Sequence, residues 1–338
     1  MIHESVVGCV GRTPLVYLRR LFPQWGLDVI AKLEMLNPGG SIKDRPARFI
    51  VERGLEDGTI APGAHLIEST SGNLGIALAM VARVYGLNFT CVVDPKISPM
   101  NLSILENIGA NIHMVHEQDD QGGYLKTRIR HVHKLLQTTP NSLWINQYAN
   151  QLNWQAHYHG TGREIVEALD GPIDCLVMAV STTGTIMGVA RRLRCEFPWL
   201  RVIAVDAVGS IIFGKPAAPR ELPGIGSSRV PELLNTAEID EVIQVSDRES
   251  VAGCRQLVAR EGILAGGSSG SVISAINKLL PTFPPRYRVL TLLPDRGERY
   301  LDMAYNDEWV ANLPYHEAFD MPQDFLVTPT ARELDLVA

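Results

Sequence analysis

The stretch NPGGSIKDR, residues 37–45, decides how the rest of the chain is interpreted. A proline and two glycines end the extended segment 29–33, and Ser41 is a suitable N-cap for a helix that begins near residue 42. Lys43 then lies in the first turn of that helix, where the helix dipole disfavours an ammonium and lowers the pKa of the amine. This environment suits a lysine that forms a Schiff base, because only a neutral amine attacks an aldehyde. A solvent-exposed lysine in a first turn fits the same stretch equally well.

Segments typical of buried strands and of helices alternate along the chain. Runs typical of strands occur at 29–33, 65–69, 89–93, 111–115, 175–180, 202–205, 241–245 and 287–293. Apolar residues at helical spacing lie between them, at 42–54, 75–85, 100–108, 124–136, 154–169, 185–197, 248–261 and 269–280. Such alternation predicts an α/β fold with parallel sheets that are covered by helices on both faces. Two successive sets of these units predict two open, twisted sheets.

The composition argues against several classes of protein. The chain has 338 residues, of which 46% are apolar and 20% charged, and a net charge of −6. No basic stripe indicates nucleic-acid binding, and no run of about 18 apolar residues indicates a membrane span. The five cysteines form no CxxC pair, so the sequence predicts neither a metal site nor a disulfide framework. The N-terminus lacks the pattern of a signal peptide, and we therefore expect a cytoplasmic protein.

Three loops rich in glycine and hydroxyl residues follow predicted strands and open predicted helices. They are ESTSGNLG (68–75), STTGT (181–185) and GGSSG (266–270). Ligands of open parallel sheets bind at the carboxyl ends of strands, and the N–H groups of a helix N-terminus suit carboxylates and phosphates. The second loop predicts a phosphate cup, and because it lacks a Walker lysine and the GxGxxG pattern, a nucleotide is disfavoured. Each loop taken alone also fits a simple capping turn without a ligand.

Taken together, the lysine stretch and the three loops resemble the cysteine synthase group of fold-type II pyridoxal-phosphate enzymes, whose fold is like that of the tryptophan synthase β subunit. The order and spacing of the motifs agree from GRTP at 11–14 to LPDRGERY at 293–300. The resemblance implies that Lys43 forms a Schiff base with the cofactor, pyridoxal 5′-phosphate. It also implies that Asn73 contacts the 3′-oxygen of the cofactor and that Ser268 faces its pyridine nitrogen.

Two further groups of residues are assigned by the same resemblance. The residues implied to hold the cofactor phosphate are Ser181, Thr182, Thr183, Gly184 and Thr185. The residues implied to grip the carboxylate of the amino-acid substrate are Thr70, Ser71 and Gly72.

The implied chemistry is a β-replacement. A serine opposite the pyridine nitrogen leaves that nitrogen unprotonated, which weakens the ring as an electron sink and favours elimination over transamination. Lys43, once released from the cofactor, is implied to remove the α-proton of the substrate. Loss of the β-leaving group then gives a bound aminoacrylate, to which a second nucleophile adds.

Several positions depart from the pattern of plain cysteine synthases. Those enzymes usually carry GTGGT and TSGNT, whereas this chain has STTGT at 181–185 and TSGNL at 70–74. Together with INQYANQLN (145–153) and PDRGERY (294–300), these changes resemble the branch of N-(2-amino-2-carboxyethyl)-L-glutamate synthases. That branch replaces the phosphate of O-phospho-L-serine by the amino group of L-glutamate, on the route to L-2,3-diaminopropionate for siderophores and antibiotics.

Both substrates of that branch are anionic, and a multiply charged leaving group needs cationic or hydroxyl donors. We expect Arg128 to be an anion contact, with Tyr148 and Ser181 as donors beside it and Gln147 near the entrance. A solvated helix face is the competing interpretation of Arg128, because cationic residues flank it in the sequence. Tyr148 also fits a packed aromatic side chain.

The resemblance leaves other functions open. The nearest is a cysteine synthase that combines O-acetylserine or O-phosphoserine with sulfide. A serine or threonine dehydratase and a catalytically inactive binding partner are further alternatives, although the intact Lys43 and Asn73 argue against the last. The family also implies a two-fold homodimer. Its domains would be a large cofactor-binding domain of residues 1–40 and 150–314, a small mobile domain of residues 41–149, and a tail of residues 315–338.

Overall fold

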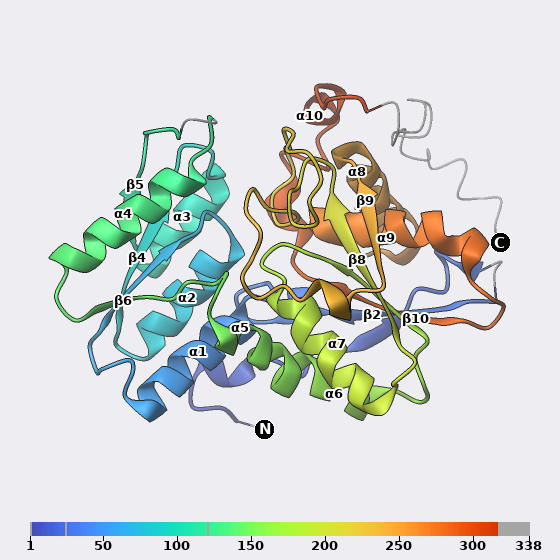
Figure 1. Ribbon diagram of the computed structural model, residues 1–338, viewed down its shortest axis with the longest axis horizontal. Helices are drawn as coiled ribbons and strands as arrows, with labels where there is room; N and C mark the ends of the chain where they lie inside the picture. Colours follow the sequence, from blue (N-terminus) through green and yellow to red (C-terminus); the bar gives the residue numbers. More distant parts are fainter. Residues whose placement is uncertain (1, 24–25, 120–121, 317–338) are drawn as a thin grey trace.

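The computed structural model describes residues 2–23, 26–119 and 122–316. Within these residues the chain forms two sheets, which lie side by side along the long axis of the molecule (Figure 1). The predicted tail, 315–338, lies outside the described residues apart from its first two. In the described part of the chain, every helix is too short or too polar to traverse a bilayer.

The larger sheet has the strand order β1-β2-β10-β7-β8-β9. Its strands are β1 (Leu15–Tyr17), β2 (Asp28–Leu33), β7 (Cys175–Ala179), β8 (Arg201–Ala207), β9 (Glu241–Val245) and β10 (Arg288–Leu293). The smaller sheet has the order β5-β4-β3-β6. Its strands are β3 (His65–Ser69), β4 (Asn88–Val93), β5 (Asn111–Met114) and β6 (Ser142–Trp144). All four lie inside the predicted small domain, 41–149, whose boundaries stay a prediction.

The strands are parallel with one exception. β1 pairs antiparallel with β2, with Leu15 opposite Lys32. The sequence analysis expected parallel sheets throughout, and this expectation is wrong at the edge of the larger sheet. A three-residue strand at an edge needs no crossover helix, so a short connection can bring it back antiparallel to its neighbour.

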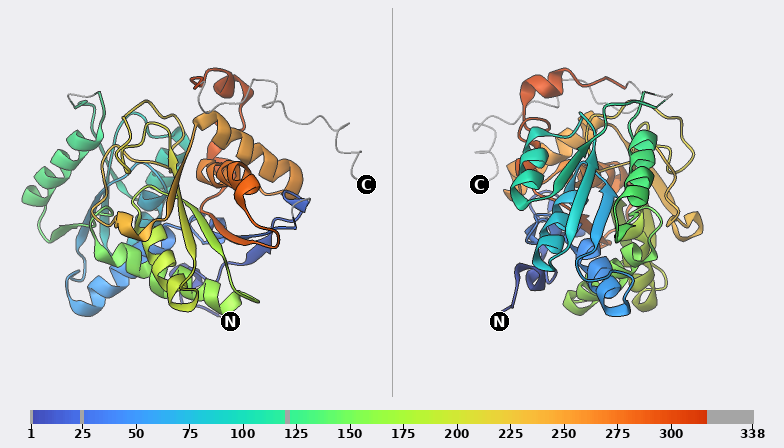
Figure 2. Two further views of the ribbon diagram at one scale, coloured as in Figure 1. Left: turned by 45° about the vertical axis from the view of Figure 1, so that its right-hand side comes forward. Right: turned by 90° about the vertical axis from the view of Figure 1, so that its left-hand side faces the viewer.

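Helices cover both faces of each sheet, as the alternating pattern predicted. They are α1 (Asp44–Asp57), α2 (Asn73–Val84), α3 (Pro99–Ile108), α4 (Leu125–Thr138), α5 (Gln151–Ala156), α6 (Arg163–Ala168), α7 (Gly184–Glu196), α8 (Asp247–Gln256), α9 (Gly267–Leu279) and α10 (Asp307–Ala311). In Figure 2, α4 lies on one side of the smaller sheet, and α2 and α3 lie on the other. The predicted helices 154–169 and 248–261 are continuous but contain π-helical segments, at His157–Gly162 and Leu257–Glu261.

The start of α1 differs from the prediction by two residues. Ser41 is not the N-cap: the helix begins at Asp44, and Lys43 occupies the capping position. Ser41 pairs with Asp295 in an isolated β-bridge, and the backbone N–H of Ile42 donates to the carbonyl of Pro294 at 2.8 Å. These contacts hold residues 41 and 42 against the end of β10 and delay the helix. Lys43 therefore lies at the junction of α1 and the larger sheet.

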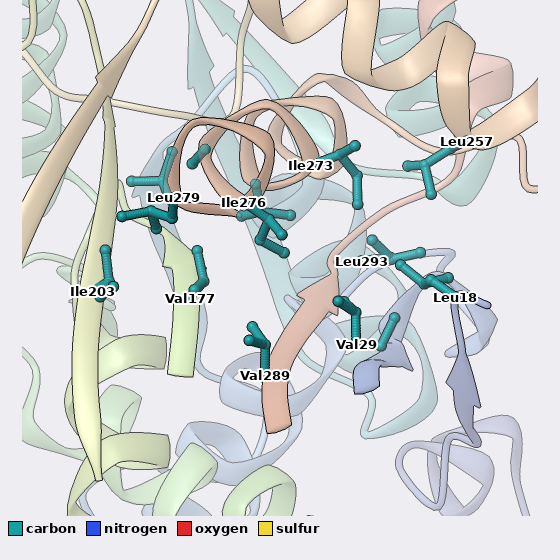
Figure 3. Packing of buried hydrophobic residues seen from close by; sticks show 14 of the residues in the cluster. Leu18, Val29, Val177, Ile203, Leu257, Ile273, Ile276, Leu279, Val289 and Leu293 are labelled. Carbon is teal, nitrogen blue, oxygen red and sulfur yellow. The ribbon is translucent and has the colours of Figure 1, made fainter. Parts of the chain in front are cut away.

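The core of the larger sheet is divided by the sheet itself. On one face, α9 places Ile273, Ile276 and Leu279 against strand residues that include Val177 and Val289 (Figure 3). On the opposite face, α7 packs on the neighbouring strand positions, Leu176 and Leu290. Successive strand residues thus point into different cores, which requires the near-continuous apolar runs seen in the sequence. This packing fixes the carboxyl ends of β7 and β10, from which site residues project.

Candidate active site

A cavity of about 1490 Å³ lies where the carboxyl ends of strands from the two sheets face each other. Its wall contains the segments that follow β3, β4 and β6 of the smaller sheet and β7 and β10 of the larger sheet. The predicted site residues line this cavity, with the exception of Gly184. A Cβ on Gly184 would lie 2.5 Å from Asn153 Oδ1, so a glycine at this position permits close packing against Asn153.

Lys43 projects into the cavity from the junction before α1. Burial lowers the pKa of its amine to about 8, and the charge of Asp295 opposes this shift. The sequence analysis attributed a lowered pKa to the helix dipole. The direction is the same, but the main cause is the loss of hydration in the cavity wall. A substantial fraction of the amine is consequently neutral near pH 8 and able to act as a nucleophile or base.

The 181–185 loop links β7 to α7 and closes one end of the cavity. Thr183 adopts a left-handed conformation, with φ of 62°, immediately before the 13-residue helix α7. Its Oγ1 is buried and has no hydrogen-bond partner in the described structure. Thr185 Oγ1 lies 3.3 Å from Nε2 of His157, whose pKa is held well below its usual range by burial. Hydroxyl groups and helical N–H groups together form an anion-binding cup.

Asn73 opens α2 and is held from two sides. Its Nδ2 donates to Asp295 Oδ2 at 2.7 Å, and its Oδ1 accepts from the guanidinium of Arg299. Ser268, the second residue of α9, is buried and also lines the cavity. The described structure therefore brings Lys43, Asn73, Ser268 and the 181–185 loop around one space, although they are far apart in sequence.

Arg128 is not on a solvated helix face. Its side chain is only 14% exposed, and it lies 3.3 Å from Asp94. The guanidinium donates to Ser71 Oγ at 2.7 Å, and its Nε is buried without a partner. This arrangement places a cation beside the 70–72 loop at the cavity wall, where it faces any anion that enters.

Gln147 and Tyr148 follow β6, the neighbour of β3 in the smaller sheet, and line the same cavity. The backbone N–H of Gln147 donates to Oε2 of the buried Glu68 at 3.2 Å. Burial raises the pKa of Glu68 to about 7, although Trp144, Gln147 and Ser69 all donate to it. Tyr148 packs under the guanidinium of Arg229, which lies 4.8 Å from the ring centroid. Burial also raises the pKa of its phenol.

Several residues at the cavity were missed by the sequence analysis. Asp295 and Arg299 lie in the PDRGERY segment, which was noted for its resemblance to a branch but not as part of the site. Asp94 faces Arg128, and Arg220 comes from the segment 208–235, which contains no helix or strand. The length of that segment was an available signal, because long connections without regular structure are usually functional or disordered.

The chain matches a family model described as pyridoxal-phosphate dependent enzyme over residues 6–295. It belongs to this family. The sequence is 61% identical over 313 residues to N-(2-amino-2-carboxyethyl)-L-glutamate synthase of Ralstonia nicotianae, covering 93% of both chains. The chain is also similar to a solved O-acetylserine dependent cystathionine beta-synthase from Helicobacter pylori (33% identity, TM-score 0.83, 89% of this chain and 98% of that one). A solved O-ureido-L-serine synthase gives 30% identity and a TM-score of 0.84, over 92% of this chain and 100% of the other.

These similarities confirm the predicted fold class, the resemblance to the cysteine synthase group and its branch, and the cofactor. The chain is a pyridoxal-phosphate-dependent enzyme, not an inactive binding partner. The residues that line the cavity also have the chemistry needed to hold the cofactor. A buried threonine hydroxyl without a partner lies at the helical cup, and an amine of lowered pKa projects into the same space.

Proposed function

We propose that the enzyme replaces the phosphate of O-phospho-L-serine by the amino group of L-glutamate and forms N-(2-amino-2-carboxyethyl)-L-glutamate. The observation that carries this proposal is the 61% identity, over 93% of both chains, to a synthase of that name. The cavity supports it, because Arg128, Arg220 and Arg299 all line the wall. Cations in this number suit two substrates that carry carboxylates and a phosphate between them.

In this proposal the cofactor is held by three parts of the cavity. Lys43 would bind its aldehyde carbon, and the hydroxyls and N–H groups of the 181–185 loop would bind its phosphate. Ser268 would face the pyridine nitrogen, and Asn73 would contact the 3′-oxygen. When bound, pyridoxal phosphate supplies an electron sink that makes the α-proton of the amino acid acidic. Lys43 then accepts that proton at Nζ and later returns it to the same carbon.

The substrates are recognised by the outer part of the cavity. Thr70, Ser71 and Gly72 bind the α-carboxylate of phosphoserine, and Arg128 binds an anionic group with Tyr148, Gln147 and Ser181 beside it. In the balanced reaction, the dianionic phosphate ester of phosphoserine reacts with the ammonium group of glutamate. The products are the secondary ammonium of the adduct and hydrogen phosphate. One proton of the glutamate ammonium therefore passes to the phosphate, and the net charge of the reactants is unchanged.

We also infer properties that lie beyond the reaction itself. The segment 41–149 moves as a unit and closes the cavity around bound substrate, which excludes water from the reacting carbon. Two chains form a two-fold homodimer in the cytoplasm. The product feeds the formation of L-2,3-diaminopropionate for siderophore biosynthesis.

The decisive experiment varies the nucleophile and the leaving group independently. The purified enzyme, loaded with cofactor, is incubated with O-phospho-L-serine or O-acetyl-L-serine, and in each case with L-glutamate or sulfide. Mass spectrometry of the four mixtures identifies the products. We expect the glutamate adduct from phosphoserine as the principal product. Formation of cysteine alone, from either serine ester, would instead identify a cysteine synthase.

A further inference from the structure

Asp295 is a buried carboxyl that lines the cavity and to which no role has yet been assigned. It follows β10, and only 2% of its surface is exposed. Its Oδ2 accepts from Asn73 Nδ2 and from the phenol of Tyr300, each at 2.7 Å. Its Oδ1 is buried without a hydrogen-bond partner and packs against Gly266, where an added Cβ would lie 2.0 Å away.

The hydrogen bonds to Oδ2 favour the ionised form of Asp295 against the effect of burial. A guanidinium can only donate, so the Asn73 oxygen must be the atom that faces Arg299. The Asn73 amide nitrogen therefore faces Asp295, and an amide nitrogen also only donates. With the Tyr300 hydroxyl, Oδ2 then receives two donors, which is the pattern of a carboxylate. Burial has the largest effect and leaves the pKa of Asp295 raised, while Asn73, Tyr300, Arg299 and Lys43 all act to lower it.

Lys43 follows Ser41 by two residues, Ser41 pairs with Asp295 in a β-bridge, and both Lys43 and Asp295 line the cavity. Asp295 is the group whose charge raises the pKa of the Lys43 amine against the effect of burial. The two do not form a direct ion pair in the described structure, so they interact through space. His157 also lies near Lys43, and burial keeps its imidazole neutral. Four further titratable groups in the described structure interact with Asp295: Arg299, Tyr300, Cys254 and Tyr305. Burial raises the pKa of the Cys254 thiol and of the two tyrosine phenols, so these three groups are uncharged near neutral pH.

We propose that Asp295 is the counter-ion of Lys43, a positioning residue whose carboxylate holds the positive charge of the lysine amine during turnover. The inference rests on the proposed role of Lys43 as the amine that binds the cofactor and removes the α-proton. The proton leaves the α-carbon and binds to Nζ, which creates an ammonium inside the cavity. A buried ammonium without a counter-ion is strongly disfavoured. Asp295 compensates that charge until Nζ gives the proton back to the α-carbon.

The test changes the charge of Asp295 and follows Lys43 without any amino-acid substrate. The cofactor is removed from the full-length protein, pyridoxal phosphate is added back, and the rate at which the visible absorbance of the bound cofactor develops is measured from pH 5 to 10. In the wild type, the rate should rise with pH until Lys43 is neutral. In Asp295→Asn the midpoint should move down by about one pH unit, which makes uptake about tenfold faster at acidic pH.

Tyr300→Phe is the matched control, because it removes one hydrogen bond to Oδ2 and leaves both charges in place. Its midpoint should stay at the wild-type position. An unchanged midpoint in Asp295→Asn, or an equal movement in both variants, would overturn the proposal. If Asp295→Asn does not fold, as judged by circular dichroism, Asp295→Ser is measured with the same two outcomes.

A second measurement uses the loaded enzyme. Asp295→Asn should lower kcat by at least tenfold, while KM for phosphoserine changes little, because Asp295 does not contact the substrate. The acid limb of the kcat profile should also move to lower pH. A loss confined to KM would contradict the proposal. The uptake experiment contains no serine ester and no nucleophile, so its outcome does not depend on which reaction the enzyme catalyses.

Discussion

Arg128→Ala should selectively weaken the binding of an anionic substrate. The guanidinium donates to Ser71 Oγ at 2.7 Å and faces the cavity beside the loop that we assign to the substrate carboxylate. A hydrogen bond to a charged group contributes about 1.5–3 kcal/mol. At about 1.4 kcal/mol for each factor of ten, its loss should raise KM for phosphoserine or for glutamate by roughly 10- to 150-fold.

A matched control for Arg128 lies on the same helix. Arg130 is also in α4, but its side chain is 62% exposed and pairs with the equally exposed Glu117. Such a pair contributes about 1 kcal/mol or less. Arg130→Ala should therefore leave both KM values near those of the wild type.

The assay varies phosphoserine at saturating glutamate and then glutamate at saturating phosphoserine, for the wild type and both variants. The visible absorbance of the cofactor should be the same in all three proteins, because Arg128 is not among the groups that we assign to the cofactor. If Arg128→Ala and Arg130→Ala give equal KM values for both substrates, Arg128 does not bind either one. If Arg128→Ala loses the cofactor, its role is structural, and the unpaired Asp94 would be the reason.

Three further predictions follow from buried groups. Arg45 donates from Nε and Nη2 to the two carboxylate oxygens of Glu34, which is fully buried. In thermal unfolding, Arg45→Met should therefore lower the free energy of unfolding by about 3–5 kcal/mol. Arg53→Met, on the exposed side of the same helix, should lower it by about 1 kcal/mol or less. Thr183→Ala should weaken pyridoxal phosphate binding roughly tenfold or more in a fluorescence titration, while Thr183→Ser should not, because the hydroxyl is retained. Burial lowers the pKa of Lys43 to about 8 in the folded protein from the 10.5 of an exposed lysine, so the unfolded chain binds more protons between these pH values, and the stability of the cofactor-free protein should rise from pH 8 to 10.5. Lys43→Met should lose that rise in urea unfolding, and an identical pH dependence in both proteins would contradict the assignment.

Local sequence patterns were sufficient to predict most of the secondary structure. The apolar run 175–180 and the helical spacing of 185–197 correspond to β7 and α7, and Gly109 ends α3 in a left-handed conformation as a helix-terminating glycine should. The strand β6 was missed because Ser142–Trp144 is too short to show a period. The early part of α1 was misplaced because the backbone of residues 41 and 42 bonds to the end of β10, which local sequence does not reveal.

The candidate site was predicted at Lys43, at Arg128 and in the glycine- and hydroxyl-rich loops, but four other charged residues of its wall were missed: Asp94, Arg220, Asp295 and Arg299. The composition of the segment PDRGERY is typical of a solvent-exposed segment, since charged residues are mostly exposed. In the structure Asp295 is buried, and Arg299 reaches back to Asn73 and to the carbonyl of Gly39. Burial of a charge depends on partners from distant parts of the chain, which a single sequence does not place.

The same charged segment explains how two sheets can support one site. Asp295 follows a strand of the larger sheet, whereas Asn73 opens a helix that packs on the smaller sheet, and the bond between them is 2.7 Å long. Arg299 adds a second link to Asn73 and one to the turn that precedes Lys43. Arg128, in contrast, contacts Ser71 and Asp94 in the outer part of the cavity. The geometry thus separates the part of the site that contains Lys43 and Asp295 from the part that contains Arg128, and this is why Asp295 substitutions should act on kcat and Arg128 substitutions on KM.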